Sequence, residues 1–235
     1  MEKDYIIKTN NLTKRIGKIN IVEGVNLNVR KGSIYGFIGE NGAGKTTILR
    51  LIAGLSNSTN GSVYLFGEEQ KKSVNLHSEK IGALIENPIF YPNLTGYDNL
   101  KYFCIQKGIP LDRIEEKLKL MNLEVKSRKK VKNYSLGMKQ RLGISLALLN
   151  NPELLILDEP LNGLDPKGIA EIRKLLIKIN EENKTTIVVS SHILSELEHI
   201  ATDYGIMHHG KLISEFGADK LTNKELEEYF IEVTS

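Results

Sequence analysis

The segment Gly39-Glu40-Asn41-Gly42-Ala43-Gly44-Lys45-Thr46 constrains the fold more than any other part of this chain. It follows a dense apolar run at residues 33–38 and precedes residues 47–55, where apolar side chains recur at helical spacing. A buried strand, a glycine-rich turn and a helix form the context in which G-x-x-x-x-G-K-T binds phosphate. Backbone N–H groups converge on phosphate oxygens, and the N-terminus of the helix adds positive potential. The sequence therefore predicts a phosphate-binding loop on an α/β core.

The residues of this loop have separate expected tasks. Lys45 should bridge the β- and γ-phosphates of a nucleotide, the Thr46 hydroxyl should ligate Mg²⁺, and Thr47 should reach the α-phosphate. The remaining expected nucleotide contacts are at Gly39, Asn41, Gly42, Ala43 and Gly44. The alternative is a glycine-rich turn with an incidental lysine, and the flanking strand and helix disfavour it.

Two carboxylates follow an apolar strand far along the chain. Residues 154–157 are predicted to form a buried strand, and Asp158 and Glu159 come directly after them. The strand should aim both side chains at the phosphates. Asp158 suits water-mediated binding of Mg²⁺, and Glu159 could polarise an attacking water as general base. The alternative for Asp-Glu-Pro is a capped turn, which the phosphate loop makes the weaker interpretation.

Length and composition limit the architecture. A typical domain has about 150 residues, and this chain of 235 residues is longer by about half. That length favours one domain, residues 1–235, with an embedded subdomain. Charge is nearly balanced, with 32 basic and 29 acidic residues, so no nucleic-acid partner is expected. The single cysteine excludes an intramolecular disulfide. Residues 1–4 lack the pattern of a signal peptide, and no apolar run approaches the roughly 20 residues that span a bilayer. If a membrane is involved, another chain crosses it.

Apolar periodicity predicts the order of the elements. Strands are expected around residues 5–8, 25–29, 33–38, 62–66, 154–157 and 186–190. Residues 92–149 have a helical pattern instead and are expected to form an embedded helical subdomain. In this stretch Thr95 is a predicted N-cap, Asp112 opens a helix over residues 113–123, and Ser135 caps another through Leu149. A further helix is expected over residues 167–182, and residues 217–235 should form a short C-terminal helical tail. The core should be a largely parallel sheet.

Three further motifs resemble those of a known family. Ser135-Leu136-Gly137-Met138-Lys139-Gln140 resembles the LSGGQ signature of ATP-binding cassette (ABC) proteins, although Leu136 and Met138 depart from the commonest letters. Asn162-Gly163-Leu164-Asp165 resembles the D-loop of the family, and Ser190-Ser191-His192 resembles its switch histidine. The resemblance covers residues from about 5 to 216. Without the neighbouring motifs, residues 135–149 would be an ordinary capped amphipathic helix.

This resemblance implies a fold and a mechanism. The fold would be α/β, a P-loop NTPase of the ABC nucleotide-binding type, with a RecA-like core, N-terminal antiparallel β strands and an inserted α-helical subdomain. The cofactors would be ATP and Mg²⁺. Two chains would pair head to tail, and the signature of each would reach the γ-phosphate held by the other. Leu164 and Asp165 would lie at the contact between the chains, and His192 would hold the attacking water together with Glu159. The signature residues concerned are Ser135, Leu136, Gly137 and Met138.

Two positions depart from the family. Ile16 stands where an aromatic residue usually stacks on adenine. Tyr5 or Tyr35 could substitute for it, although core packing is the favoured interpretation of both tyrosines. Glu86 stands where a glutamine is usual, in Ile81-Gly82-Ala83-Leu84-Ile85-Glu86-Asn87-Pro88, and a carboxylate there would add a full negative charge beside Mg²⁺.

Glu86, residues 93–100 and the signature together resemble ATP-binding subunits of lantibiotic-immunity and bacitracin-resistance exporters. That resemblance implies a peripheral subunit on the cytoplasmic face of the membrane, paired with a second ATP-binding chain. A homodimer is the favoured pair, and a related second ATPase chain is the alternative. The subunit would energise a separate permease that exports a peptide antibiotic, with residues 91–102 forming a groove for the permease. One alternative is a soluble ABC ATPase acting on nucleic acid or the ribosome, but the chain has no room for a long coiled coil or a second cassette. Another is a P-loop kinase, which would need no signature.

A basic run precedes the signature. Its members are Lys126, Arg128, Lys129, Lys130 and Lys132. A solvated helical face is one interpretation of such a run. The alternative is a surface near anionic lipid headgroups.

Overall fold

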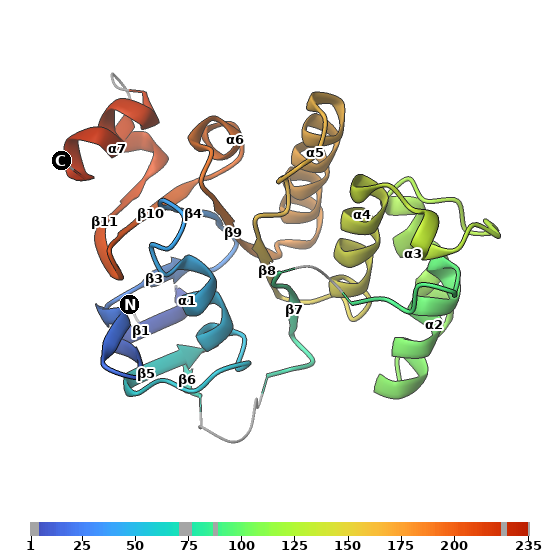
Figure 1. Cartoon of the computed structure of the whole chain (residues 1–235), viewed down its shortest axis with the longest axis horizontal. Helices are drawn as coiled ribbons and strands as arrows, with labels where there is room; N and C mark the ends of the chain where they lie inside the picture. Colours follow the sequence, from blue (N-terminus) through green and yellow to red (C-terminus); the bar gives the residue numbers. More distant parts are fainter. Residues whose placement is uncertain (1–4, 71–76, 87–88, 222–224, 235) are drawn as a thin grey trace.

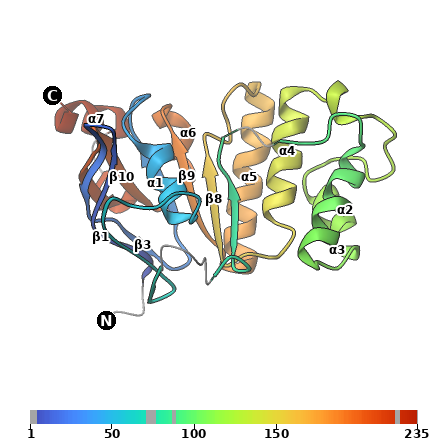
Figure 2. The same cartoon turned by 60° about the horizontal axis from the view of Figure 1, so that its bottom comes forward.

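The computed structural model describes residues 5–70, 77–86, 89–221 and 225–234. An antiparallel sheet, a mostly parallel core sheet and a group of helices follow one another across the molecule, with the helix α1 (Lys45–Ile52) between the two sheets (Figures 1 and 2). No helix in the described part of the chain is both long enough and apolar enough to cross a membrane.

The antiparallel sheet is built mainly from the N-terminal segment. Among the described residues its strand order is β2-β1-β5-β6, and β3 also pairs with β1. This confirms the expected N-terminal antiparallel strands. The strands are β1 (Tyr5–Ile16), β2 (Ile19–Val25), β3 (Asn28–Arg30), β5 (Asn60–Leu65) and β6 (Glu68–Glu69).

The core sheet has the order β11-β10-β4-β9-β8-β7, and every neighbouring pair except β10 and β11 is parallel. All residues of β4, β8 and β9 are buried, as expected for parallel strands covered on both faces. Because the carboxyl ends of these three strands meet at one edge, the loops that follow them converge there. The strands are β4 (Ile34–Ile38), β7 (Ile81–Leu84), β8 (Leu154–Asp158), β9 (Thr186–Ser191), β10 (Asp203–His208) and β11 (Lys211–Gly217).

The helices follow the predicted order with shifted ends. The caps predicted at Thr95 and Ser135 are confirmed, since the side chains accept from the backbone N–H groups of Asp98 and Met138. The helix after the phosphate loop starts at Lys45, two residues earlier than predicted. The helices are α2 (Gly96–Lys107), α3 (Asp112–Leu120), α4 (Leu136–Ala147), α5 (Pro166–Asn183), α6 (Leu194–Glu198) and α7 (Leu226–Thr234), with 3₁₀ turns η2 (Val131–Asn133) and η3 (Ala218–Leu221).

The basic run before the signature does not form the helical face that was one of its two interpretations. Residues 122–130 are loop, and the short 3₁₀ turn η2 follows them. The helix α3 ends at Leu120 instead of Leu123 because Asn122 turns the chain with a φ of 53°. No apolar residue recurs at helical spacing within the run to hold a helix in place.

Two apolar clusters hold these layers together. One fills the space between the sheets around α1 and includes Tyr35, Phe37 and Ile48. The other continues from the core sheet into α2, α3, α4 and α5, through residues such as Leu100 and Leu142. The helical group thus shares a continuous core with the sheet that carries the phosphate loop.

Candidate functional site

The phosphate loop connects β4 to α1 at the carboxyl edge of the core sheet. Gly44 precedes the helix with a φ of 103°, a conformation that favours glycine, and a Cβ there would lie 2.9 Å from the carbonyl oxygen of Ile21. The side chain of Lys45 is buried, and its Nζ donates to the carbonyl oxygens of Gly39 (2.5 Å) and Glu40 (3.2 Å). These two contacts hold the lysine ammonium over the loop.

Asp158 is fixed by two hydroxyl groups at the end of β8. Thr46 Oγ1 donates to Asp158 Oδ2 (2.7 Å), and Ser190 Oγ donates to Asp158 Oδ1 (2.6 Å). The same Ser190 oxygen accepts from the backbone N–H of Glu159 (2.9 Å). Asp158 and Ser190 face each other in the register of β8 and β9. The sequence analysis did not predict this role for Ser190.

Glu159 connects the histidine to the lysine. Its Oε2 lies 2.5 Å from His192 Nδ1, and its Oε1 lies 3.5 Å from Lys45 Nζ. Its backbone has a φ of 50°, so a non-glycine residue is kept in the left-handed region at this position. Glu159, His192 and Lys45, which are distant in the sequence, thus form one charged cluster.

A cleft of about 420 Å³ opens in front of this cluster. Its lining includes residues 40–47, and the described residues that complete it are Ile21, Glu159 and Asn162. Ile21 was not singled out in the sequence, and Asn162 was named only as the first residue of the segment resembling the D-loop, not as a residue of the cleft. The cleft has the size of a small-molecule site and is walled by backbone N–H groups and a lysine, which suits a polyphosphate.

The oxygens beside the loop suit a hard divalent cation. Thr46, which lines the cleft, and the buried Asp158 offer a hydroxyl and a carboxylate 2.7 Å apart. Within the described residues no group of three or more His, Cys, Asp and Glu could hold a metal ion by itself. Mg²⁺ is commonly held by one or two protein oxygens together with substrate phosphates, so this sparse donor set fits it.

The signature segment lies on the other side of β8 from α1 in both views (Figures 1 and 2). Ser135 caps α4, with its Oγ accepting from the Met138 N–H (3.3 Å), and both Ser135 and Leu136 are exposed. Of the described residues that line the cleft, none belongs to α4. The N-terminus of α4 is thus open to a second molecule and does not serve the cleft of its own chain.

The segment after β8 contacts the signature of the same chain. A Cβ on Gly163 would lie 2.5 Å from Leu136 Cδ2, and one on Gly137 would lie 3.2 Å from Leu164 Cδ2. Asp165 caps α5 by accepting from the Gly168 N–H (3.1 Å), so its carboxylate has a structural role within the chain. Burial raises the pKa of Tyr134, directly before the signature, which keeps its phenol neutral.

The position expected to stack on adenine is exposed. Ile16 ends β1, has an exposed fraction of 61%, and is opposite Ile19 of β2. Neither tyrosine considered as a substitute lies beside Ile16. Tyr35 is fully buried and donates to Glu215 (2.8 Å), which confirms the alternative that it belongs to the core, and Tyr5 lies at the far end of β1, opposite Arg30.

Glu86 lies beside the P-loop helix. Its Oε2 is 2.5 Å from Arg50 NH2, and both side chains are partly exposed. Arg50 is one helical turn after Thr46, so both project from the same face of α1. The backbone of Glu86 has a φ of 61°. Asn87 and Pro88, the end of the matched segment, lie outside the described residues, as do residues 1–4.

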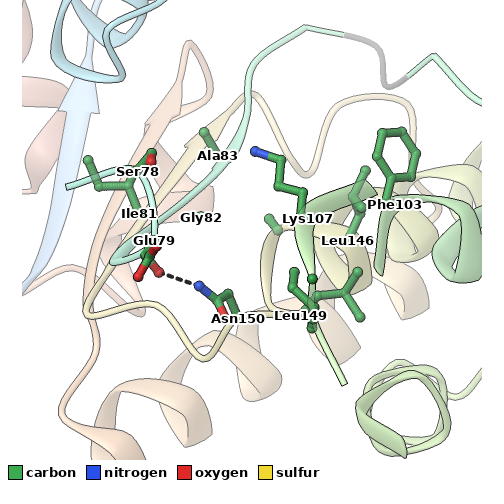
Figure 3. Close-up of a pocket in the computed structure, with 13 residues that line it drawn as sticks. Ser78, Glu79, Ile81, Gly82, Ala83, Phe103, Lys107, Leu146, Leu149 and Asn150 are labelled. Atoms are coloured by element: carbon green, nitrogen blue, oxygen red, sulfur yellow. Dashed lines mark hydrogen bonds between the residues drawn. The ribbon is translucent and has the colours of Figure 1, made fainter. Parts of the chain in front are cut away.

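A second cavity, of about 460 Å³, separates β7 from the helical group (Figure 3). Phe103 and Lys107 enter it from α2, and Leu146 and Leu149 lie on the side of α4. Asn150 Nδ2 donates to the carbonyl oxygen of Glu79 across one end (2.7 Å). The cavity adjoins the segment 91–102 that was expected to form a groove. Tyr91 and Tyr102 of that segment are partly exposed, with ring centroids 4.9 Å apart.

The chain is similar in sequence to known proteins of one family. Residues 22–162 match the family model described as ABC transporter. The chain is 49% identical to the bacitracin transport ATP-binding protein BcrA of Enterococcus faecalis, over 94% of this chain and 72% of that protein. It is 45% identical to the lantibiotic transport ATP-binding protein SrtF of Streptococcus pyogenes, over 96% of each chain.

Solved structures agree with this family match. The dimeric, post-hydrolysis state of the ATP-binding cassette MJ0796 bound to ADP and Pi has a TM-score of 0.81 and 29% identity, covering 90% of this chain and 98% of that one. A structure of the ATP-binding subunit of an ABC transporter has a TM-score of 0.86 and 27% identity, covering 98% and 100%. The predicted fold class is thereby confirmed.

Proposed function

This chain belongs to the ABC transporter family and hydrolyses ATP, and on that premise we propose that it energises a separate membrane permease exporting a peptide antibiotic of the bacitracin or lantibiotic type. Kinship with BcrA and SrtF over most of the chain supports this cargo. The protein would then act at the cytoplasmic face of a membrane that its partner crosses.

The residues of the cleft divide the chemistry among them. The loop N–H groups and Lys45 bind the phosphates and stabilise charge that develops during transfer to water. Glu159 accepts the proton of the attacking water, and His192, 2.5 Å from its carboxylate, orients that carboxylate and the γ-phosphate. Thr46 and Asp158 would hold Mg²⁺, which when bound neutralises charge on the β- and γ-phosphates. Ser190 keeps Asp158 in position.

The exposed N-terminus of α4 supports a head-to-tail pair of identical chains. Ser135 Oγ and the first N–H groups of α4 form a second site for an anion, facing away from their own cleft. In such a pair each α4 would meet the γ-phosphate in the other chain's cleft. ATP would then be shared between the chains, and hydrolysis would release them.

The cavity between β7 and α2 supports a docking place for the permease. It joins the sheet that carries the cleft to the helices that carry the signature (Figure 3). A helix of the permease bound in this cavity would contact both the core sheet and the helical group. It would therefore move when the helical group moves relative to the sheet. Phe103 and the neighbouring Tyr102 would supply apolar contacts.

One observation carries the proposal. The chain has both the cluster of Glu159, His192 and Lys45 beside the cleft and, away from this cleft, the exposed N-terminus of α4, which suits an anion. The test begins by identifying hydrophobic membrane proteins encoded next to the gene of this chain. Each is then co-expressed with the chain in a bacterium sensitive to bacitracin and lantibiotics. Wild type should raise resistance and co-purify with the membrane protein. Glu159→Gln should co-purify without raising resistance, whereas the surface control Lys174→Gln should behave as wild type.

Two results would contradict the proposal. One is unchanged resistance with wild type in the presence of its neighbouring membrane protein. The other is resistance that survives Glu159→Gln, because transport would then not depend on hydrolysis.

A further inference from the structure

The loop between α3 and α4 concentrates the positive charge of the molecule. Within residues 122–133 it has five basic residues against one glutamate, an excess of four, whereas the whole chain has an excess of three. All five basic side chains are exposed. This basic loop, residues 122–133, lies at the right edge of Figure 1 in yellow-green.

The backbone of the basic loop is held in place. Val131 N donates to Leu94 O (2.9 Å), and Lys132 N donates to Pro92 O (2.9 Å). Lys130 also forms a β-bridge with Thr95. Leu123 and Val131 are buried, so apolar side chains anchor the loop while its basic side chains point outward.

The basic side chains are not neutralised within the chain. None of the five forms an ion pair within 4.0 Å in the described part of the structure. Glu115, which interacts with Lys126 only at longer range, is paired with Lys119 (2.7 Å). The loop therefore presents an uncompensated positive surface to whatever approaches it.

Exposed apolar side chains adjoin this surface. Leu94, in the segment 92–95 that pairs with the basic loop, has an exposed fraction of 37%. Tyr91 and Ile89, which directly precede that segment, have exposed fractions of 46% and 92%. Tyrosine at the headgroup level, together with lysine and arginine, is the combination that favours a membrane surface with anionic lipids. An anionic bilayer offers both an acidic surface and an apolar layer beneath it, which matches the basic loop and the exposed Ile89 together.

We propose that the basic loop binds the anionic phospholipid headgroups of a bilayer directly, beside the place where the permease docks. Lysine and arginine near an anionic membrane each strengthen binding by about fivefold. The loop would keep the subunit at the membrane and fix its orientation. This contact needs no permease, so it can be tested without one.

The test is flotation of the purified chain with vesicles of phosphatidylcholine alone, or of phosphatidylcholine mixed with phosphatidylglycerol. Wild type should float only with the mixed vesicles, and high salt should release it. Lys126→Gln, Lys130→Gln and Lys132→Gln together should weaken that binding by about a hundredfold. The control replaces Lys174, Lys178 and Lys184, around α5, by glutamine. It removes the same charge and should keep the binding.

Three outcomes would overturn the inference. Equal binding to both kinds of vesicle would show that charge is not used, and equal losses in the two triple variants would assign binding to net charge. Absence of vesicle binding, with loss of the co-purified membrane protein in the loop variant alone, would assign the loop to an acidic protein surface. ATP hydrolysis by the free chain should be the same in both variants. A failure of the lipid-binding inference is therefore distinguishable from a failure of the transport proposal.

Discussion

Glu159 lies between His192 and Lys45, with one carboxylate oxygen 2.5 Å from the histidine Nδ1 and the other 3.5 Å from the lysine Nζ. The proposed base and the lysine of the phosphate loop therefore form one ion pair. A γ-phosphate bound by Lys45 would share that cation with the carboxylate of Glu159. The same carboxylate would hold the attacking water together with His192.

We expect Glu159→Gln to keep the shape of the cleft and to lose the base. Hydrolysis should fall by a hundredfold or more, on the order of the usual contribution of a general base. ATP should still bind, so the variant should accumulate as a dimer in size-exclusion chromatography with ATP. Adding Ser135→Phe should weaken that dimer, since a large side chain would block the end of α4. A variant that stays monomeric in saturating ATP would contradict the head-to-tail pair.

Lys45→Ala should remove the principal cation of the cleft. A hydrogen bond to a charged group contributes about 1.5–3 kcal/mol, which corresponds to a loss of about ten to a hundredfold in affinity for ATP. The fold should persist, because the helices and strands do not depend on this side chain. Circular dichroism checks that they are retained. Calorimetric titration of the folded variant is the measurement, and wild-type affinity would rule out the role given to Lys45.

The exposed Ile16 predicts weak selection among nucleobases. The phosphates supply most of the binding, so ATP and GTP should be hydrolysed at rates within about an order of magnitude. Ile16→Tyr should add stacking of about 1–3 kcal/mol and tighten binding of both nucleotides. Ile16→Leu is the matched control and should change little. A strong preference of wild type for ATP would mean that another group recognises adenine.

Glu86 is expected to couple hydrolysis to transport. Glu86→Gln should keep much of the ATPase activity, since Lys45, Asp158 and Glu159 remain, yet should support antibiotic resistance less well. The reason is that a carboxylate responds more strongly than an amide to Mg²⁺ and to the γ-phosphate. ATP turnover of the reconstituted complex and resistance in cells are compared. Equal losses in both, or no loss in either, would end this interpretation.

The pair of Arg50 and Glu86 extends this test. Arg50→Gln should release the carboxylate one turn from Thr46 and lower the Mg²⁺ concentration at which ATP binds, whereas Glu86→Gln should raise it. The double variant should resemble Glu86→Gln. Thermal stability should be unaffected, because exposed ion pairs contribute about 0–1 kcal/mol. The measurement is binding of ATP to each variant at increasing Mg²⁺ concentration, under conditions in which ATP is not hydrolysed.

Gly82 should prove necessary for the contact between β7 and α4. A Cβ there would lie 2.1 Å from the carbonyl oxygen of Ala147 and 2.9 Å from Pro152 Cγ. Gly82→Ala should therefore destabilise the protein by about 1–3 kcal/mol in chemical denaturation. Ala83→Ser, at the exposed next position of the strand, should stay within about 0.5 kcal/mol of wild type.

The phosphate loop and the carboxylate pair could be predicted because each is a contiguous motif at the end of a buried strand. The caps at Thr95 and Ser135 were equally local. The role of Ser190 was not predictable in this way. It depends on the register that sets Asp158 opposite Ser190, and a single sequence does not reveal strand pairing.

Other differences have the same origin in tertiary structure. The contact between Glu86 and Arg50 depends on a loop residue with a positive φ, for which glutamate gives no signal. The basic run was ambiguous because long charged side chains are common in helices, and pairing with residues 92–95 kept it extended. The burial of Tyr35 was predictable, because it stands in the dense apolar run at residues 33–38 that indicates a buried strand.

The contact between Leu136 and Gly163 joins two segments of one chain that would serve different clefts in the proposed pair. Gly163 follows the carboxylates of the chain's own cleft, and Leu136 belongs to the helix that would complete the cleft of the other chain. Leu136 Cδ2 lies 2.5 Å from the place where a Cβ of Gly163 would be, so a shift of either segment changes the packing of the other. In the proposed pair of chains, loading one cleft would thereby alter the affinity of the other. Hydrolysis would then be cooperative in ATP concentration, with this apolar contact as one part of the coupling.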